Sequence, residues 1–313
     1  MRLIVDSGST KTDWCLIGDE ACYESNGSIM SPGINPVRDD RDTIAHVLGG
    51  VCARLPEAEE EMHFDTILGV HADPLPAGPI HLSDRVKALA CQVAEVHFYG
   101  AGCLPATIPT MQGLLQAFFP AARVHVASDM LGAARALCGS QEGIACILGT
   151  GANSCLYDGR DIVANVPALG WIMGDEGSGA VLGRTLVADV LKGQLPAPLC
   201  HAFLEQYQLT TEAVIQAVYR GPQPNRLLAS FVPFLAQHRD EPAISALLTD
   251  AFRRFFRRNV LPYGRPDLSV HLVGGVACEF RDEIRAAAQA EGLSVGRILK
   301  QPGYALCCYH RNT

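Results

Sequence analysis

Residues 3–19 read LIVDSGSTKTDWCLIGD, and residues 145–159 read ACILGTGANSCLYDG. In each stretch a short apolar run breaks at a turn of small residues and then resumes as a second apolar run. This pattern predicts two strands joined by a tight turn. Gly8 and Gly151 lie 151 − 8 = 143 residues apart, close to half of the 313-residue chain, so the sequence predicts two related domains.

The segments around the two hairpins alternate between helical and strand periodicity. Apolar residues at helical spacing predict helices over 40–55, 83–93, 178–191, 199–207, 211–218 and 244–260, and apolar runs before polar turns predict strands over 96–99, 124–126 and 270–273. Alternating strands and helices favour an α/β fold. We expect two α/β lobes with a cleft between their glycine turns, and a hinge near 137–142.

The composition is that of an ordinary globular protein, with 48% hydrophobic and 19% charged residues. Twenty-five Lys and Arg against 33 Asp and Glu give a net charge of −8, which argues against nucleic acid as a partner. No apolar run reaches the roughly 18 residues of a membrane helix, and no secretion signal is recognised, so we expect neither a membrane partner nor a secreted protein.

The 12 cysteines are therefore expected to be reduced core thiols in a cytoplasmic protein, with Cys15, Cys146 and Cys155 inside strands. Cys307, Cys308 and His310 form the nearest approach to a metal-ligand cluster. No matching second pair of ligands exists, so a buried helix face is favoured over a metal site there.

The two small-residue turns point to phosphate binding. Such a turn after a strand lets backbone N–H groups converge on an anion, and Lys11 adds a positive charge. Either turn alone is equally explained as a tight β-hairpin, but one turn per half suits a phosphate chain held from both sides. Neither turn matches the P-loop pattern, and no GxGxxG opens a helix after an early strand.

Acidic residues follow three of the predicted strands or turns. Asp6 ends the first strand, where its carboxylate could hold Mg²⁺ through water, although a turn-capping Asp is the alternative. Asp129 follows the strand at 124–126 and begins a helix, so taken alone it is better explained as a helix N-cap. The stretch GDEGSG at 174–179 also places acids at a helix start.

Three motifs, at 6–12, 149–151 and 273–276, resemble the two phosphate motifs and the adenosine motif of the ATPase superfamily that includes actin, hexokinase and sugar kinases. More narrowly, GINP at 33–36, SD at 128–129, GTGANS at 149–154 and GDEGSG at 174–179 resemble N-acetylglucosamine kinases of the BadF/BadG/BcrA/BcrD-type ATPase family. The resemblance spans nearly the whole chain.

The resemblance implies two ribonuclease-H-like lobes, 1–138 completed by a C-terminal helix at 302–313, and 139–301 with helical insertions. It implies ATP and Mg²⁺ between the lobes, a small-molecule sugar deeper in the cleft, phosphorylation of N-acetylglucosamine at its 6-hydroxyl, and a homodimer as a candidate assembly. By this resemblance, Ser9, Thr10 and Lys11 lie in the phosphate loop, and Asp6 lies near the metal ion. Thr150 and Gly151 form the second phosphate turn, and Gly274 and Gly275 pass close to the adenosine. Asn35, Asn153 and Asp175 bind sugar hydroxyls, and Asp129 is the general base.

Some positions depart from the family pattern. Ala152 stands where a serine is common, Trp171 fits core packing better than sugar stacking, and the segment 57–78 matches poorly. Within the same family, an ATPase activator of a radical dehydratase is the alternative function, but its iron–sulfur cluster needs a cysteine in the second glycine motif, whereas Cys146 precedes that motif. A DNA-binding sugar sensor would need a segment ahead of Asp6, and we expect none.

Overall fold

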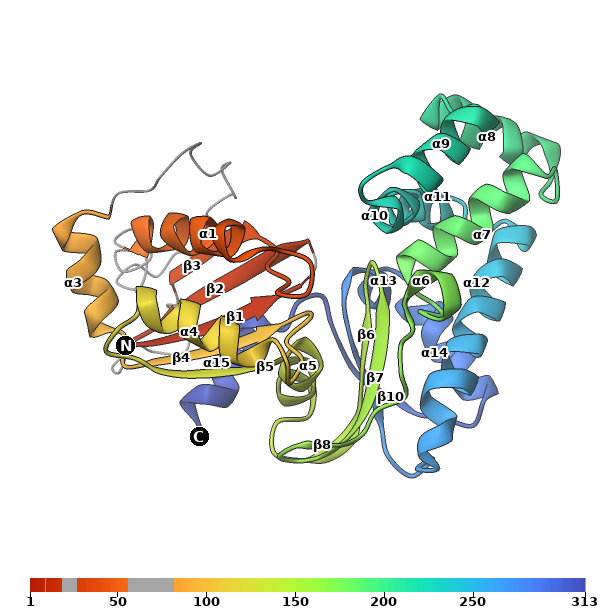
Figure 1. Cartoon of the computed structure of the whole chain (residues 1–313). Helices are drawn as coiled ribbons and strands as arrows, with labels where there is room; N and C mark the ends of the chain where they lie inside the picture. Colours follow the sequence, from red (N-terminus) through yellow and green to blue (C-terminus); the bar gives the residue numbers. More distant parts are fainter. Residues whose placement is uncertain (9, 19–26, 56–81, 313) are drawn as a thin grey trace. The chain divides into compact units, whose positions relative to one another are not determined.

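Each half of the chain builds a five-stranded sheet in the computed structural model, which describes residues 1–8, 10–18, 27–55 and 82–312 (Figure 1). The described residues fall into two compact units: unit 1 is Met1–Gly139 with Pro302–Thr313, and unit 2 is Ser140–Gln301. Ser9 and the segment 57–78 lie outside the described residues.

The sheet of unit 1 has the order β3-β2-β1-β4-β5. Its strands are β1 (Arg2–Ser7), β2 (Lys11–Ile17), β3 (Gly27–Pro32), β4 (Glu95–Gly100) and β5 (Arg123–Ser128). The hairpin β1–β2 is antiparallel and pairs Ser7 with Thr12, whereas β4 and β5 run parallel to β1. The carboxyl ends of β1, β4 and β5 therefore share one edge of the sheet, which is where ligands bind in open α/β sheets.

Alternate side chains of β1 face two different hydrophobic layers. Leu3 and Val5 pack with the helices α1 (Arg41–Ala53), α3 (Asp84–Gln92) and α4 (Ile108–Phe118). Ile4 points to the opposite face and packs with Leu306. That face is covered by α5 (Asp129–Cys138) and by the C-terminal helix α15 (Gly303–Arg311), so the end of the chain completes the core of unit 1.

A buried polar network lies under α15. The Tyr99 hydroxyl contacts His310 Nε2 at 2.8 Å and accepts a hydrogen bond from Arg135 Nη1 at 2.7 Å. Burial, reinforced by nearby positive charges, lowers the pKa of His310 to about 3, so this imidazole is neutral. Of the three residues predicted to form a buried helix face, Cys307 and His310 are buried and Cys308 is half-buried. The described residues contain no group of side chains that could hold a metal ion.

The sheet of unit 2 has the order β10-β9-β6-β7-β8. Its strands are β6 (Glu142–Leu148), β7 (Ala152–Asp158), β8 (Ile162–Ala164), β9 (Val270–Val273) and β10 (Val295–Leu299). Here again a hairpin, β6–β7, is extended by an antiparallel strand on one side and by parallel strands on the other. The two units thus repeat one topology, as the echo of the glycine turns predicts. Cys15, Cys146 and Cys155 are buried in β2, β6 and β7, also as predicted.

Unit 2 carries the helical insertions. Its helices are α6 (Gly170–Met173), α7 (Gly179–Leu191), α8 (Ala197–Tyr207), α9 (Thr211–Arg220), α10 (Pro224–Ala229), α11 (Val232–Gln237), α12 (Pro242–Phe255), α13 (Gly275–Glu279) and α14 (Arg281–Ala290). The helices α7 to α11 pack against one another (Figure 1). Trp171 is partly buried against the core of this unit, in agreement with the packing interpretation.

The helix predicted over 244–260 is interrupted. After α12 the chain forms a π-helical turn, Phe256–Val260, and a 3₁₀ turn, Leu261–Tyr263. The wider turn holds the buried Asn259. Its backbone carbonyl accepts a hydrogen bond from the Ser154 hydroxyl at 2.7 Å, and its side-chain Nδ2 donates to Glu176 Oε2 at 3.1 Å. Single π turns are frequent near functional sites, and this one contacts the strand that follows the second glycine turn.

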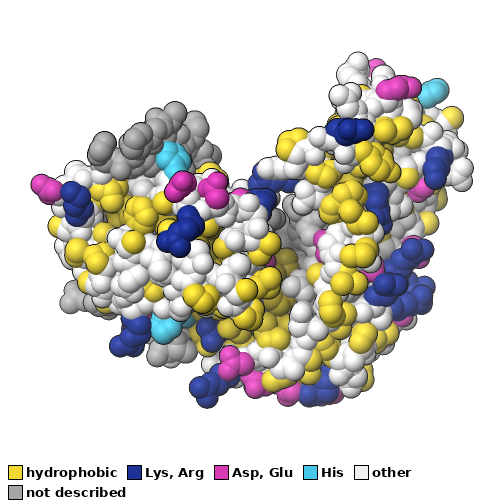
Figure 2. Space-filling view, in the orientation of Figure 1, with side chains coloured by type: hydrophobic (Ala, Val, Ile, Leu, Met, Phe, Trp, Pro, Cys, Tyr) yellow, Lys and Arg dark blue, Asp and Glu magenta, His cyan; other side chains and the backbone are white. Residues whose placement is uncertain are grey.

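Lys and Arg side chains gather over α12 of unit 2, as Figures 1 and 2 show together. Arg253 and Arg257 both bind Glu291, at 2.6 and 2.8 Å, and Arg254 binds Asp250 at 2.8 Å. Each of these three arginines is therefore paired with a carboxylate of the same unit, although Arg253 and Arg257 share one carboxylate. Among the described residues, none of the helices has the length and apolar character needed to span a bilayer.

Candidate active site

The first glycine turn joins β1 to β2 at the carboxyl edge of the unit 1 sheet. The amide of Gly8 donates to the carbonyl of Lys11 at 3.0 Å, and the side chains of Thr10 and Lys11 are exposed. The positive charge of Lys11 lies near enough to Asp6 to offset part of the rise in pKa that burial causes in that carboxyl. An exposed cation beside a tight turn is suited to binding an anion.

Asp6 stands beside two further carboxyls. It pairs with Asp13 across the hairpin, and the charge of Asp129 also acts on it. Burial first, and then the charges of Asp129 and Asp13, raise the pKa of Asp6 to about 7.

Asp129 is the first residue of α5, directly after β5. The N-cap of α5 is Ser128, whose hydroxyl accepts a hydrogen bond from the Leu131 amide at 3.2 Å, so the capping explanation of Asp129 is wrong. Asp129 Oδ1 accepts a hydrogen bond from the Met130 amide at 2.9 Å, and its side chain is only half-buried. Desolvation raises the pKa of Asp129, and backbone hydrogen bonds partly offset the rise.

The residues around Asp6 fit a magnesium ion. A divalent cation would offset the repulsion and desolvation that hold the pKa of Asp6 at about 7. Among the described residues no group of three ligands could enclose a metal ion, but Mg²⁺ binds through one or two carboxylates and completes its shell with water and phosphate. Asp6, with Asp129 near it, meets that requirement.

Asn35 lies in the loop that follows β3 and is held from several sides. Its backbone N–H donates to Asp39 Oδ2 at 2.8 Å, and its side-chain Oδ1 accepts a hydrogen bond from the backbone N–H of Val37 at 3.0 Å. Its side chain also lies against Gly102, where it occupies the space that a Cβ would need. Gly102 has φ = 77°, so both its conformation and its neighbour require glycine.

In unit 2 the second glycine turn caps a helix. The Gly149 carbonyl accepts a hydrogen bond from the Gly179 amide at 2.8 Å, and the Thr150 carbonyl accepts one from the Ala180 amide at 3.1 Å. Both donors belong to the first turn of α7, whose N-cap is Ser178. The stretch 174–179 and the turn at 149–151 therefore form one rigid corner, and capping again falls to a serine and not to the acids at 175 and 176.

Asp175 lies over the second glycine turn. Its Oδ2 is 3.0 Å from the position of a Cβ on Gly151, and its carboxylate accepts backbone hydrogen bonds from Ala152 and Gly170. Its φ of 51° is one of three positive values among the described non-glycine residues, and such strain often marks functional sites. Burial, partly offset by these hydrogen bonds, raises the pKa of Asp175 to about 6.

Asn153 is the second residue of β7, directly after the buried Ala152. Its Oδ1 accepts hydrogen bonds from the Ser154 amide at 2.9 Å and from Asn165 Nδ2 at 3.0 Å, so the orientation of its amide group is fixed. Asn165, which also donates to the Ser154 carbonyl at 2.5 Å, holds the Asn153 side chain in place and is indicated by no sequence motif.

Gly274 and Gly275 connect β9 to α13. Gly274 has φ = 132°, and its amide donates to the Leu299 carbonyl at 2.9 Å. Its Cα lies so close to the Leu148 carbonyl, at the end of β6, that a Cβ would overlap that oxygen. Gly275 is exposed and faces open space.

The predicted site residues thus form one group in each unit. The group in unit 1 lies at the carboxyl ends of β1 and β5 or in the turns beside them, and consists of Asp6, Thr10, Lys11, Asn35 and Asp129. The group in unit 2 surrounds the ends of β6 and β9, and consists of Thr150, Gly151, Asn153, Asp175, Gly274 and Gly275. Two units that repeat one sheet order, each with a glycine-rich hairpin turn, define the two-lobed actin-like ATPase class, in which hexokinases are found.

Comparison with solved structures identifies the family. The Porphyromonas gingivalis protein described as a "Putative N-acetylglucosamine Kinase" is 45% identical in sequence and has a TM-score of 0.85, over 100% of this chain and 99% of that one. A protein of the same description from Chromobacterium violaceum is 21% identical, with a TM-score of 0.68 over 100% and 99% of the two chains, and supports the fold. No family model matches, and neither does a curated protein sequence.

The chain belongs to the N-acetylglucosamine kinase-like family of BadF/BadG/BcrA/BcrD-type ATPases, and as an enzyme it is a sugar kinase. The motifs at 33–36, 128–129, 149–154 and 174–179 are thus confirmed as marks of this family.

Proposed function

We propose that the enzyme transfers the γ-phosphoryl group of ATP to the 6-hydroxyl of N-acetylglucosamine, with Asp129 as the general base. The observation that carries the proposal is the state of Asp129. Asp129 is a partly buried carboxyl group beside Asp6, and the N-cap of α5 is Ser128. A carboxylate that is not the helix N-cap, at the edge where ligands bind, is suited to accept the proton of a hydroxyl.

The remaining residues of unit 1 would bind and orient the reactants. In phosphoryl transfer, the protein mainly aligns the reactants and compensates the negative charge of the transferring group. Lys11 would face the phosphates, and Asp6 would hold Mg²⁺, which when bound neutralises phosphate charge and orients the transferring group. Asn35, fixed by Asp39 and Gly102, would accept and donate hydrogen bonds to sugar hydroxyls. Ser9 is assigned to the phosphate loop by resemblance alone.

In unit 2, the glycine turns would bind the nucleotide and polar side chains would bind the sugar. Thr150 and Gly151 would approach the phosphates, and Gly274 and Gly275 the adenosine. Asp175 and Asn153, whose side chains are held by backbone amides and by Asn165, would bind sugar hydroxyls. A pre-oriented carboxylate and amide discriminate between sugars because a missing hydroxyl leaves them unpaired.

The sugar is taken from the description of the Porphyromonas gingivalis relative and from the family resemblance. A screen tests it: ADP release is measured with Mg²⁺-ATP and N-acetylglucosamine, N-acetylmannosamine, glucosamine or glucose. We expect the highest kcat/KM with N-acetylglucosamine, and NMR of the product should show the phosphate on O6. No sugar-dependent ADP release with any of the four would contradict the proposed function, and a preference for another sugar would contradict only the substrate.

Sugar binding should also depend on pH through Asp175. With a pKa of about 6, this carboxylate is ionised at pH 8 and mostly protonated at pH 5. We expect the sugar Kd, measured by calorimetry without nucleotide, to be about tenfold weaker at about pH 5 than at about pH 8.

Stability changes in the opposite direction. Because the pKa of Asp175 is higher in the folded protein than in the unfolded chain, its contribution to stability is largest below the unfolded value and is lost as pH rises through about 6. Protonation of Asp175 therefore does not itself destabilise the fold at low pH. Asp175→Asn should bind the sugar weakly at both pH values; an unchanged pH profile in this variant would remove Asp175 from the sugar site.

The alternative of a dehydratase activator has no structural support in the described residues. Cys146 is fully buried within β6 and pairs with Ser154 in the hairpin register, away from the turn at 149–151. A thiolate ligand of an iron–sulfur cluster between subunits would have to reach the surface.

A further inference from the structure

Two hydroxyl side chains flank the first glycine turn and are completely buried. Ser7 ends β1, Thr12 lies opposite it in β2, and neither has measurable exposed surface. Their oxygens are 2.7 Å apart. Buried hydroxyls cost free energy unless they are paired, and a pair of small apolar residues would serve a hairpin as well. Their partners therefore indicate what the pair does.

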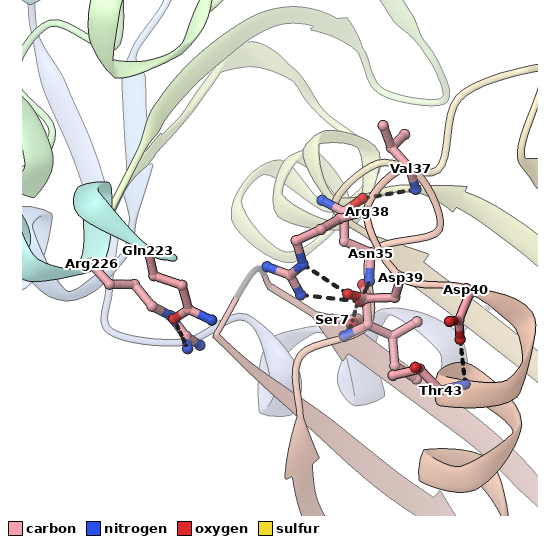
Figure 3. A network of polar contacts seen from close by, with 10 residues as sticks. Ser7, Asn35, Val37, Arg38, Asp39, Asp40, Thr43, Gln223 and Arg226 are labelled. Carbon is pink, nitrogen blue, oxygen red and sulfur yellow. Dashed lines mark hydrogen bonds and ion pairs between the residues drawn. The ribbon is translucent and has the colours of Figure 1, made fainter. Parts of the chain in front are cut away.

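The partners lie at the end of β3 and in the loop that carries Asn35, and Figure 3 shows Ser7 beside this loop. Ser7 Oγ accepts a hydrogen bond from the Ile34 amide at 3.0 Å and lies 3.1 Å from the Ile34 carbonyl. The Thr12 hydroxyl donates to the Pro32 carbonyl at 3.0 Å. The amide of Gly33 donates to the Thr10 carbonyl at 3.1 Å. Every residue from 32 to 34 is thus bonded to the hairpin of the phosphate turn.

The backbone of Ser7 fixes the other side of Asn35. The Ser7 carbonyl accepts a hydrogen bond from the Ala101 amide at 2.8 Å, and the next residue, Gly102, is the one against which Asn35 packs. Ser7 therefore contacts both the segment that precedes Asn35 and the turn that supports its side chain. A displacement of the hairpin is transmitted to Asn35 through short hydrogen bonds and not through exposed, adjustable contacts.

We propose that the Ser7–Thr12 hydroxyl pair is a positioning element that sets the sugar-binding geometry of Asn35 from the phosphate turn. The inference rests on the proposed function, because it takes Asn35 as a sugar ligand. Ser7 and Thr12 touch neither substrate. They determine where Asn35 stands relative to Asp6 and Lys11, in the same unit.

Thr12 offers a matched pair of variants. Thr12→Val keeps the shape and removes the hydroxyl, whereas Thr12→Ser keeps the hydroxyl. In Thr12→Val we expect the KM for the sugar to rise about tenfold with the KM for ATP within about twofold, and Thr12→Ser to restore the sugar KM to within about threefold of wild type. Ser7→Ala should reproduce Thr12→Val. A purely structural role would lower the melting temperature of these variants without a selective change in sugar KM.

A second measurement does not depend on activity. Hydrogen exchange followed by mass spectrometry should show faster exchange of the Ile34 and Asn35 amides in Ser7→Ala and Thr12→Val, but not in Thr12→Ser. Unchanged exchange in both hydroxyl-deleting variants would overturn the inference, and so would faster exchange with an unchanged sugar KM. The proposed function is decided by the wild-type sugar screen alone. If that screen shows no activity, the sugar Kd of each variant, measured by calorimetry with N-acetylglucosamine, replaces the sugar KM as the readout. A Kd that is the same in the variants as in wild type, or no binding at all, would then overturn the inference.

Discussion

Asp129→Asn is expected to lower kcat about 10³-fold or more while the Kd of the sugar stays within about fivefold of wild type. Asparagine keeps the size and the hydrogen bond from the Met130 amide but cannot accept the hydroxyl proton. The site should therefore assemble and bind without turning over. Initial rates at saturating substrates, together with calorimetric binding of the sugar, separate these two quantities.

The control for this variant lies one residue earlier. Ser128→Ala removes the N-cap of α5 and should cost about 1 kcal/mol of stability with little change in kcat. If Asp129 matters only for the helix, the two variants will behave alike, with a lower melting temperature and modest kinetic effects. A kcat for Asp129→Asn within tenfold of wild type would remove Asp129 from the role of base.

Both glycine hairpins could be predicted because their signals are local. Each strand is an apolar run, each turn consists of small residues, and the spacing of the two turns repeats, so sequence alone indicates two halves. The acids at 6 and 129 could be predicted for a related reason: Asp6 lies near the end of β1, Asp129 directly follows β5, and the ends of parallel strands meet at one edge of a sheet. The assignment of roles to them came from the family resemblance.

Other features depend on contacts between distant residues and leave little trace in the sequence. The strand β10 contains Gly296, which lies against the ring of His271 in the neighbouring strand, and β8 has only three residues. Neither shows a clear strand periodicity, because pairing with neighbouring strands determines them. Asn165 and the Ser7–Thr12 pair were missed for the same reason. In the pair at 128–129, both residue types are common N-caps, so only the structure shows which one caps α5.

Gly274→Ala is expected to destabilise unit 2 by about 3 kcal/mol or more, which corresponds to a fall of about 10 °C in melting temperature for a unit of this size. Two causes act together. The residue has φ = 132°, which a side chain disfavours, and the added Cβ would overlap the Leu148 carbonyl at the end of β6. Relief of that overlap would have to move the strand that leads into the second glycine turn, so ATP binding should weaken as well.

The adjacent glycine provides the matched control and the sharper test of the nucleotide site. A Cβ on Gly275 meets no atom within 4 Å, so Gly275→Ala should fold with a melting temperature within about 2 °C of wild type. If the adenosine passes over this turn, the same methyl group should raise the KM for ATP about tenfold and leave the sugar Kd unchanged. An ATP KM equal to that of wild type in a folded Gly275→Ala enzyme would place the adenosine elsewhere, because the methyl group then meets neither protein nor nucleotide.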